Sequence, residues 1–174
     1  MHILFVCTGN ICRSPMAERL AAAIATRFAI SNFTSSSAGT RAVVSSPMHS
    51  EAALVLNRLG AEPLNFRARQ LKSRIVLDAD LVLVMTRAHR ESVLELAPHR
   101  MSRTFLLTEA AALAVKPEVF SIDDLSNFRS QLSPADLSDI QDPIGRSSEV
   151  FANVGSQISA LLPPILELCW RHRS

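Results

Sequence analysis

A short apolar run near the start of the chain constrains the fold more than any other feature. Residues 3–6 read Ile-Leu-Phe-Val without a polar position, which is typical of a strand buried on both faces of a parallel sheet. Pro15 then opens a segment in which apolar residues recur at every fourth position from Met16 to Phe28, a pattern that predicts an amphipathic helix. A strand, a loop and a helix therefore follow one another at the start of the chain.

The same alternation continues along the chain. Further strands are predicted at residues 32–37, 80–85 and 105–107, and further helices at residues 47–60, 87–96 and from 147 to the end. Alternating strands and helices predict a doubly wound α/β domain, with a parallel sheet and helices on both of its faces. We expect one domain over residues 1–174, because a domain usually takes about 100 to 200 residues.

Two regions are expected to depart from regular structure. Residues 109–141 combine alanines with Lys-Pro and Ser-Pro steps, which favours helical pieces separated by surface loops. Pro163 and Pro164 are expected to kink the last helix. The basic end of that helix, residues 171–173, suits the negative end of a helix dipole.

Composition excludes several classes of protein. With 48% hydrophobic and 20% charged residues, the chain has enough apolar material for a core and is not expected to be disordered. A net charge of +2 gives no reason to expect a nucleic-acid binder. The apolar run 3–6 is too short for a signal peptide or a membrane span, and three cysteines suit a reducing compartment. We therefore expect a cytoplasmic globular protein.

Residues 7–15, Cys-Thr-Gly-Asn-Ile-Cys-Arg-Ser-Pro, form the predicted loop between the first strand and the first helix. A loop at the carboxyl end of a buried strand that leads into a helix directs backbone N–H groups and the positive end of the helix dipole at one point. Gly9 and Asn10 tolerate the positive φ that such a tight turn needs. The segment therefore predicts a binding site for an anion.

Three side chains of this loop suit a phosphate. The surrounding donors favour the thiolate form of Cys7, the guanidinium of Arg13 matches two oxygens of a tetrahedral anion, and the hydroxyl of Ser14 can donate to the thiolate. Cysteine and arginine at this spacing also occur by chance, but the strand before them and the helix behind them make the pattern specific. Cys12 is expected to be either a small buried residue or a redox partner, and Cys169 a core residue.

The pattern Cys-x5-Arg-Ser-Pro resembles the signature of the low-molecular-weight protein tyrosine phosphatases, and the match is nearly complete over residues 6–18. This resemblance implies a four-stranded parallel sheet flanked by helices, with Cys7 as the nucleophile and Arg13 as a second catalytic residue. It also implies that the loop binds the substrate phosphate through Thr8, Gly9, Asn10, Ile11, Cys12 and Ser14. Further matches, which extend it over most of the chain, lie at residues 37–40, 68–70, 79–81, 85–86 and 142–143.

The resemblance also implies a substrate class. Bacterial members act on phosphotyrosine proteins, often kinases of polysaccharide export, whereas related branches act on phosphoarginine or reduce arsenate. The arginine branch has a threonine at position 11, so Ile11 favours phosphotyrosine, because an isoleucine leaves the donors of a phosphoguanidine unpaired. The expected partner is a phosphorylated protein, with such a kinase as one candidate, and the expected enzyme is a monomer or weak dimer that binds neither nucleic acid nor membrane. A phosphate-binding module without catalytic activity is the alternative from another functional class.

Cleavage of a phosphate ester needs a proton for the departing oxygen, and Asp142 is the candidate donor. It is the only aspartate followed by proline, in a segment just before the last helix. An Asp-Pro step is often a plain turn, but the predicted anion site and the position in the family favour catalysis. The rival carboxylates, expected to be solvated loop residues, are Asp123, Asp124, Asp136 and Asp139.

No metal and no cofactor are expected. The five histidines have no spacing typical of metal ligands and are expected to lie on the surface. They are His2, His49, His89, His99 and His172.

The chain also departs from the family at named positions. Ile144 and the valines Val43 and Val44 stand where members commonly have aromatic residues beside the pocket. The side chains on either side of a bound phenyl ring are therefore expected to be aliphatic. Phe66 stands where many members have a histidine that braces the loop asparagine, so Asn10 is expected to lack that brace. The chain contains no tyrosine, which excludes regulation through tyrosines beside the acid.

Overall fold

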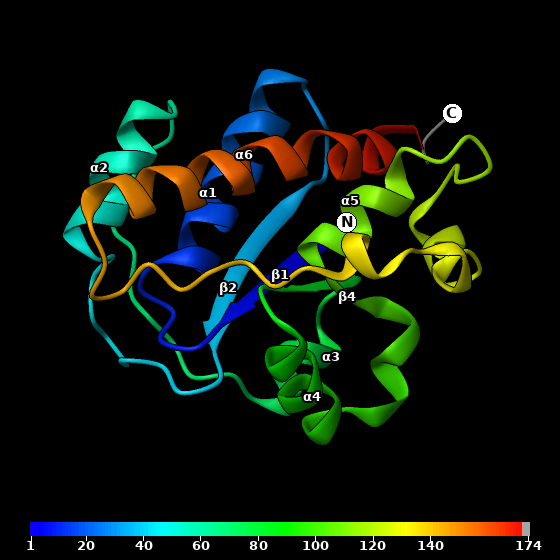
Figure 1. Ribbon diagram of the computed structural model, residues 1–174, viewed down its shortest axis with the longest axis horizontal. Helices are drawn as coiled ribbons and strands as arrows, with labels where there is room; N and C mark the ends of the chain where they lie inside the picture. The colour runs from blue at the N-terminus through cyan, green and yellow to red at the C-terminus, as the bar shows by residue number, and fades with distance from the viewer. Residues whose placement is uncertain (172–174) are drawn as a thin grey trace.

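The computed structural model describes residues 1–171, which form one four-stranded parallel sheet covered by helices (Figure 1). The strands lie in the order β2-β1-β3-β4, so that β1 is central and β2 lies at one edge. The predicted four-stranded α/β fold is therefore confirmed. The strands are β1 (His2–Cys7), β2 (Thr34–Gly39), β3 (Leu81–Val84) and β4 (Thr104–Leu106).

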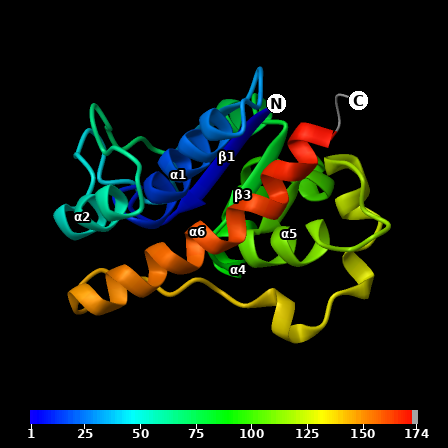
Figure 2. The same cartoon turned by 90° about the horizontal axis from the view of Figure 1, so that it is seen from above.

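Helices cover both faces of the sheet, as Figures 1 and 2 show. One face carries α1 (Arg13–Arg27), α2 (Ser50–Arg58), α5 (Leu107–Ala114) and the long α6 (Ser148–Arg171). The other face carries α3 (Ser73–Leu77) and α4 (Arg87–Leu96). Short 3-10 helices lie at Pro98–Arg103, Ile122–Ser126, Arg129–Gln131 and Pro134–Leu137.

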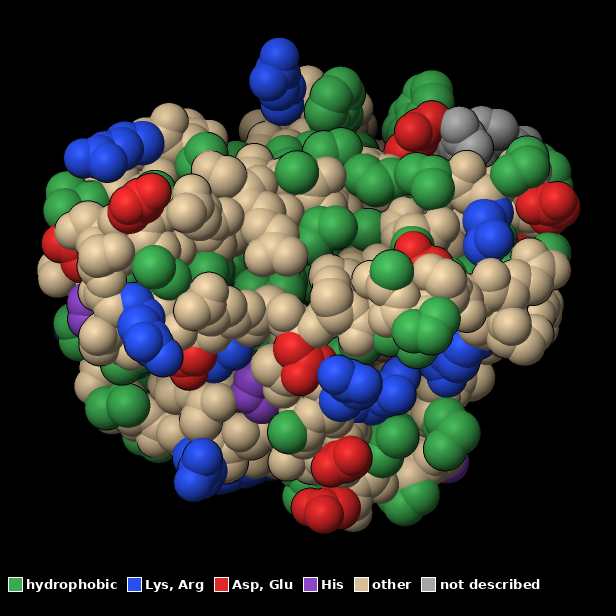
Figure 3. Space-filling view, viewed as in Figure 1, with side chains coloured by type: hydrophobic (Ala, Val, Ile, Leu, Met, Phe, Trp, Pro, Cys, Tyr) green, Lys and Arg blue, Asp and Glu red, His purple; other side chains and the backbone are tan. Residues whose placement is uncertain are grey.

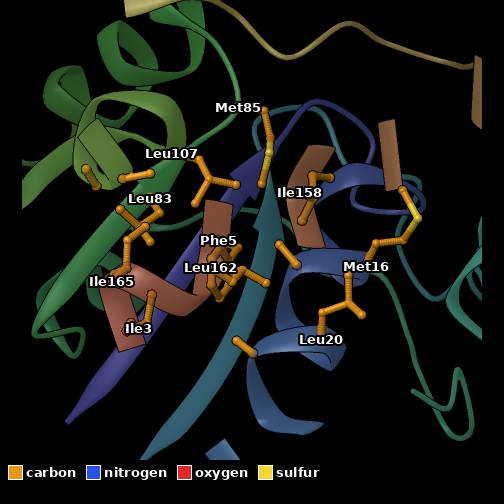
Figure 4. Close-up of a cluster of buried hydrophobic side chains, with 14 of the residues drawn as sticks. Ile3, Phe5, Met16, Leu20, Leu83, Met85, Leu107, Ile158, Leu162 and Ile165 are labelled. Atoms are coloured by element: carbon orange, nitrogen blue, oxygen red, sulfur yellow. The ribbon is translucent and has the colours of Figure 1, made fainter. Parts of the chain in front are cut away.

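Alternate residues of β1 enter two separate hydrophobic cores. Ile3 and Phe5 pack with α1, α5 and α6, and Figure 4 shows Phe5 beside Leu162 of α6. Leu4 and Val6 pack on the opposite face, in a core to which α3 and α4 contribute. Both sets are fully buried. A central strand covered on both faces has no position for a polar residue, which explains the continuous apolar run in the sequence.

Several elements differ from the sequence expectation. Strand β2 begins at Thr34, because the chain turns first through Asn32 in the left-handed region with φ 53°. The helix α3 is only five residues long, which is too short for its sequence to show a helical period of apolar residues. Helix α6 continues through Pro163 and Pro164, and residues 172–173 of its expected basic end lie outside the described residues.

Residues 109–141 contain the short helical pieces predicted for them, and a buried carboxylate holds them to the sheet. Glu109 is fully buried and accepts hydrogen bonds from Arg90 at 3.2 Å, Arg129 at 2.7 Å and the backbone N–H of Leu106 at 2.9 Å. The guanidinium of Arg129 also lies over the ring of Phe105, 4.1 Å from its centroid. These contacts fix the start of the segment that leads to Asp142.

The surface carries charges of both signs. In Figure 3, basic and acidic side chains are interspersed over the visible face, without one large patch of a single sign. Within residues 1–171, no helix is both long and apolar enough to cross a membrane.

Candidate active site

The loop of residues 8–12 joins the carboxyl end of β1 to α1. Its carbonyl groups and its N–H groups differ in their hydrogen bonding. Its carbonyl groups accept backbone hydrogen bonds: Thr8 from Arg41 at 3.0 Å, Gly9 from Val43 at 3.0 Å, Ile11 from His49 at 2.7 Å and Cys12 from Met16 at 3.0 Å. The N–H groups of residues 8–12, in contrast, donate to no other group within residues 1–171. The first N–H groups of α1 add donors at the same end, as at any helix start. This arrangement suits an anion.

Asn10 holds the turn of this loop together. It is the loop residue in the left-handed region, with φ 54°. Its side-chain oxygen accepts from the backbone N–H of Arg69 at 2.8 Å, and its side-chain nitrogen donates to the hydroxyls of Ser14 at 3.0 Å and Ser37 at 2.8 Å. Two hydroxyls and a backbone N–H therefore hold Asn10, although Phe66 replaces the histidine found in many members of the family.

The glycine that the loop requires is a different one from that predicted. Gly9 does not adopt a positive φ, and a Cβ there would meet only side chains at 3.5 Å or more. Gly39, at the end of β2, lies so close to the loop that a Cβ would come within 2.5 Å of the carbonyl oxygen of Thr8. Only glycine allows β2 to approach the loop at this point.

Cys7 and Ser14 are in contact across the loop. The sulfur of Cys7 lies 2.9 Å from the hydroxyl oxygen of Ser14, and both residues are buried. Because Ser14 already accepts a hydrogen bond from Asn10, its own proton is free to point at the sulfur. The hydroxyl can therefore stabilise a thiolate at Cys7.

Arg13 connects this loop to the segment that carries Asp142. The guanidinium donates to the carboxylate of Asp142 at 2.5 Å and to the carbonyl of Ile140 at 3.0 Å. Ile140 is itself bonded to the backbone carbonyl of Met85, at 2.8 Å. The Arg13 side chain is only 4% exposed, whereas that of Asp142 is 46% exposed. Two residues far apart in the sequence thus meet at the rim of the loop.

A cleft of about 420 Å³ opens over these groups. Its rim carries the apolar side chains of Ile11, Val43 and Ile144, and the guanidinium of Arg41. Cys12 is only 3% exposed, and burial raises the pKa of its thiol far above the ordinary value. The cleft is lined by Cys7, Thr8, Gly9, Ile11, Cys12, Arg13, Arg41, Val43, Asp142 and Ile144.

The other candidate residues lie elsewhere. Asp123 pairs with Arg103 at 2.5 Å, Asp139 pairs with Arg87 at 3.5 Å, and neither lines the cleft. Asp124 and Asp136 cap short 3-10 helices. Cys169 is buried beside Met1 and Asp80, at the amino end of the strands and away from Cys7.

Sequence reasoning missed one residue of the site. The sequence predicts His89 on the surface, but it is only 6% exposed and its ring bonds to the hydroxyl of Thr8 at 2.8 Å. Burial, together with the nearby charge of Arg13, lowers the pKa of His89 to about 4. The signal that could have found it is its place three residues after Thr86, at the start of the helix that follows β3. No cluster of potential metal ligands occurs among the described residues.

Comparison with known proteins gives one consistent result. Residues 2–124 match the family model of the low molecular weight phosphotyrosine protein phosphatases. A protein-arginine-phosphatase of Geobacillus stearothermophilus is 32% identical over 166 residues, which are 95% of this chain and 94% of that protein. The low molecular weight protein-tyrosine-phosphatase Wzb of Salmonella typhi is 38% identical over 104 residues, 60% of this chain and 66% of that protein.

Solved structures agree with this result. The crystal structure of the tyrosine phosphatase AmsI of Erwinia amylovora superposes with a TM-score of 0.73 at 27% identity, over 95% of this chain and 91% of that one. The family model, over residues 2–124, spans all four strands of the sheet and the loop of residues 7–15. The chain is therefore a phosphatase of the low molecular weight phosphotyrosine protein phosphatase family.

Proposed function

We propose that this protein hydrolyses phosphotyrosine in proteins through a cysteinyl-phosphate intermediate. The observation that carries the proposal is the hydrogen bonding of the loop of residues 8–12. Its carbonyls accept backbone hydrogen bonds from other parts of the chain, whereas its N–H groups are free to bind phosphate. Cys7 lies at the start of this loop, and Arg13 and Asp142 meet at its rim. A phosphate held by the loop would thus be in contact with a nucleophile on one side and an acid on the other.

In the first step, the thiolate of Cys7 attacks phosphorus while the bond to the tyrosine oxygen breaks. The loop N–H groups and Arg13 bind the equatorial oxygens, where charge is distributed in the transition state. The bound phosphate competes with Asp142 for Arg13, so the carboxyl group is released to carry a proton. Asp142 donates this proton to the departing oxygen.

In the second step, the carboxylate of Asp142 accepts a proton from water as the water oxygen attacks phosphorus. The sulfur–phosphorus bond breaks, inorganic phosphate leaves, and the thiolate of Cys7 is restored. The hydroxyl of Ser14, 2.9 Å from the sulfur, stabilises the departing thiolate. Neither step requires a redox change.

The rim of the cleft supports phosphotyrosine over phosphoarginine. Ile11, Val43 and Ile144 offer an aliphatic surface to a phenyl ring. These three side chains offer no hydrogen-bond acceptor to a phosphoguanidine, and each N–H donor that they leave unpaired costs about 1 to 3 kcal/mol. The relatives include phosphatases of both kinds, so the side chains at the rim carry this part of the proposal.

The experiment measures kcat/KM for matched phosphotyrosine and phosphoarginine peptides. We expect phosphotyrosine to be preferred and the preference to shift toward phosphoarginine in Ile11→Thr. Cys7→Ser should abolish turnover but keep phosphate binding, whereas Cys169→Ala, which removes a thiol far from the cleft, should keep full activity. Turnover by Cys7→Ser would disprove the mechanism, a preference for phosphoarginine would reassign the substrate, and phosphate binding without turnover would indicate a non-catalytic module.

The proposed partner is a phosphorylated protein, and a bacterial tyrosine kinase of polysaccharide export is the candidate that the family resemblance suggests. We place the enzyme in the cytoplasm, because the proposed nucleophile works only as a reduced thiol. Dephosphorylation of such a kinase in vitro, lost in Cys7→Ser, tests the partner.

A further inference from the structure

His89 connects the phosphate-binding loop to the helix α4, which covers the face of the sheet opposite to α1. It lies in α4, and its two ring nitrogens contact two threonine hydroxyls: Nε2 lies 2.8 Å from that of Thr8, and Nδ1 lies 2.9 Å from that of Thr86. Thr86 also accepts the backbone N–H of His89, at 3.3 Å. The Nδ1 side of the ring is therefore held by its own helix start, and the Nε2 side is directed at the loop.

Thr8 directly follows Cys7 and lines the cleft. Its backbone is fixed on one side, since its carbonyl accepts from Arg41 at 3.0 Å and packs against Gly39. Its hydroxyl, in contrast, has His89 as its one hydrogen-bond partner within residues 1–171. A threonine side chain has more than one staggered rotamer, so this contact selects the rotamer of Thr8 and joins the start of the loop to α4.

The imidazole suits this task because burial beside Arg13 keeps it uncharged, with a pKa lowered to about 4. A neutral imidazole donates at one nitrogen and accepts at the other, so it can join two hydroxyls. It also adds no positive charge to a site where Arg13 has to pair first with Asp142 and then with phosphate.

We propose that His89 is a positioning residue of the active site, which through Nε2 fixes Thr8 and with it the first part of the phosphate-binding loop relative to Cys7. The proposal rests on the proposed function of this loop as the phosphate site. His89 does not touch the phosphate in this role. Its effect is transmitted through one hydroxyl, and the contact at Nδ1 only anchors the ring.

Two substitutions separate the two ring nitrogens. The amide of His89→Gln reaches about as far as Nε2 and can keep the contact to Thr8, whereas the shorter amide of His89→Asn reaches only as far as Nδ1 and keeps the contact to Thr86. We expect His89→Asn to weaken both kcat/KM for p-nitrophenyl phosphate and the affinity for inorganic phosphate by about tenfold. His89→Gln should stay within about threefold of the unaltered protein in both measurements.

A matched control is available at the far end of β1. His2 is also bonded through both ring nitrogens, to the carbonyl of Asp78 at 3.1 Å and the hydroxyl of Ser36 at 2.7 Å. His2→Asn should lower the thermal midpoint in the same way as His89→Asn but leave phosphate affinity unchanged. A purely structural role for His89 would make the two variants alike in both measurements.

Thr8→Val tests the contact from the other side, with little change in side-chain volume. It should weaken phosphate binding about as much as His89→Asn, and the double variant should lose no more than either single one. Equal values for His89→Asn and His89→Gln, or full phosphate affinity in Thr8→Val, would overturn the proposal. If the unaltered protein turns over no substrate, the proposed function fails, and phosphate affinity alone then decides the role of His89.

Discussion

Replacement of Asp142 tests the general acid most directly. Its side chain is 46% exposed and makes one ion pair, with Arg13, at 2.5 Å. An exposed pair of this kind contributes about 1 kcal/mol or less to stability, so Asp142→Asn should fold normally. One carboxylate oxygen accepts from Arg13 and the other from the backbone N–H of Ile144 at 3.2 Å, so the single amide oxygen of the variant can keep one of these two contacts. The change therefore removes the transferable proton together with one surface hydrogen bond.

The size of the effect depends on the leaving group. A phenol of high pKa needs a full proton from the acid, so kcat/KM for phenyl phosphate should fall by about 10² to 10⁴ in Asp142→Asn. An activated leaving group such as p-nitrophenol can depart as the anion, so its loss in kcat/KM should be much smaller. The assay compares kcat/KM, which reports the step in which the phenol departs, over a series of substituted phenyl phosphates, and its slope against leaving-group pKa should become steeper in the variant.

Asp139→Asn is the matched control. Asp139 lies three residues earlier, pairs with Arg87 at 3.5 Å and does not line the cleft. It should change neither kcat/KM nor the slope. An equal loss over the whole series of leaving groups in Asp142→Asn, or the same loss in Asp139→Asn, would refute the assignment of Asp142 as the acid.

Three further predictions follow from buried groups. Peroxide should inactivate the enzyme reversibly, because the thiol of Cys12 can displace water from a sulfenic acid at Cys7 and form a disulfide. Cys12→Ser should therefore recover little activity on treatment with a thiol. Equal recovery of both proteins would show that Cys12 is only a packing residue. Glu109→Ala removes a fully buried carboxylate that pairs with two arginines, and urea unfolding should show a loss of about 3 kcal/mol; a loss below about 1 kcal/mol would contradict this. His89 has a pKa of about 4 when folded and 6.5 in its ordinary state, so the unfolded chain binds its proton first as the pH falls. The free energy of unfolding should thus decrease by about 3 kcal/mol more between pH 7 and pH 4 in the unaltered protein than in His89→Gln; equal slopes would place His89 in water.

Much of the fold could be predicted from short stretches of sequence. The apolar run 3–6, the loop of residues 7–15 and the fourfold period after Pro15 are local signals, because burial on both faces and helical packing impose patterns on neighbouring residues. The same holds for the family signature, which lies in one continuous segment. The amino-acid sequence alone therefore predicts Cys7, Arg13 and Ser14 as the reactive groups of the loop.

Only the tertiary structure decided which distant residues complete the loop. Sequence position predicts neither that Ser37 and the backbone of Arg69 hold Asn10, nor that Gly39 must be a glycine, because these contacts arise from the parallel pairing of β1 with β2 and the chain that follows it.

His89 illustrates the same limit. Its sequence surroundings are those of an exposed helix start, and its burial depends on where α4 packs against the end of β1. A pattern along the chain reports which face of an element is buried, whereas the partner of a polar side chain is set by the arrangement of elements in space. The sequence thus determined the strand, the loop and its reactive groups, and the packing of β2, α4 and the segment before α6 around that loop decided what holds it in place.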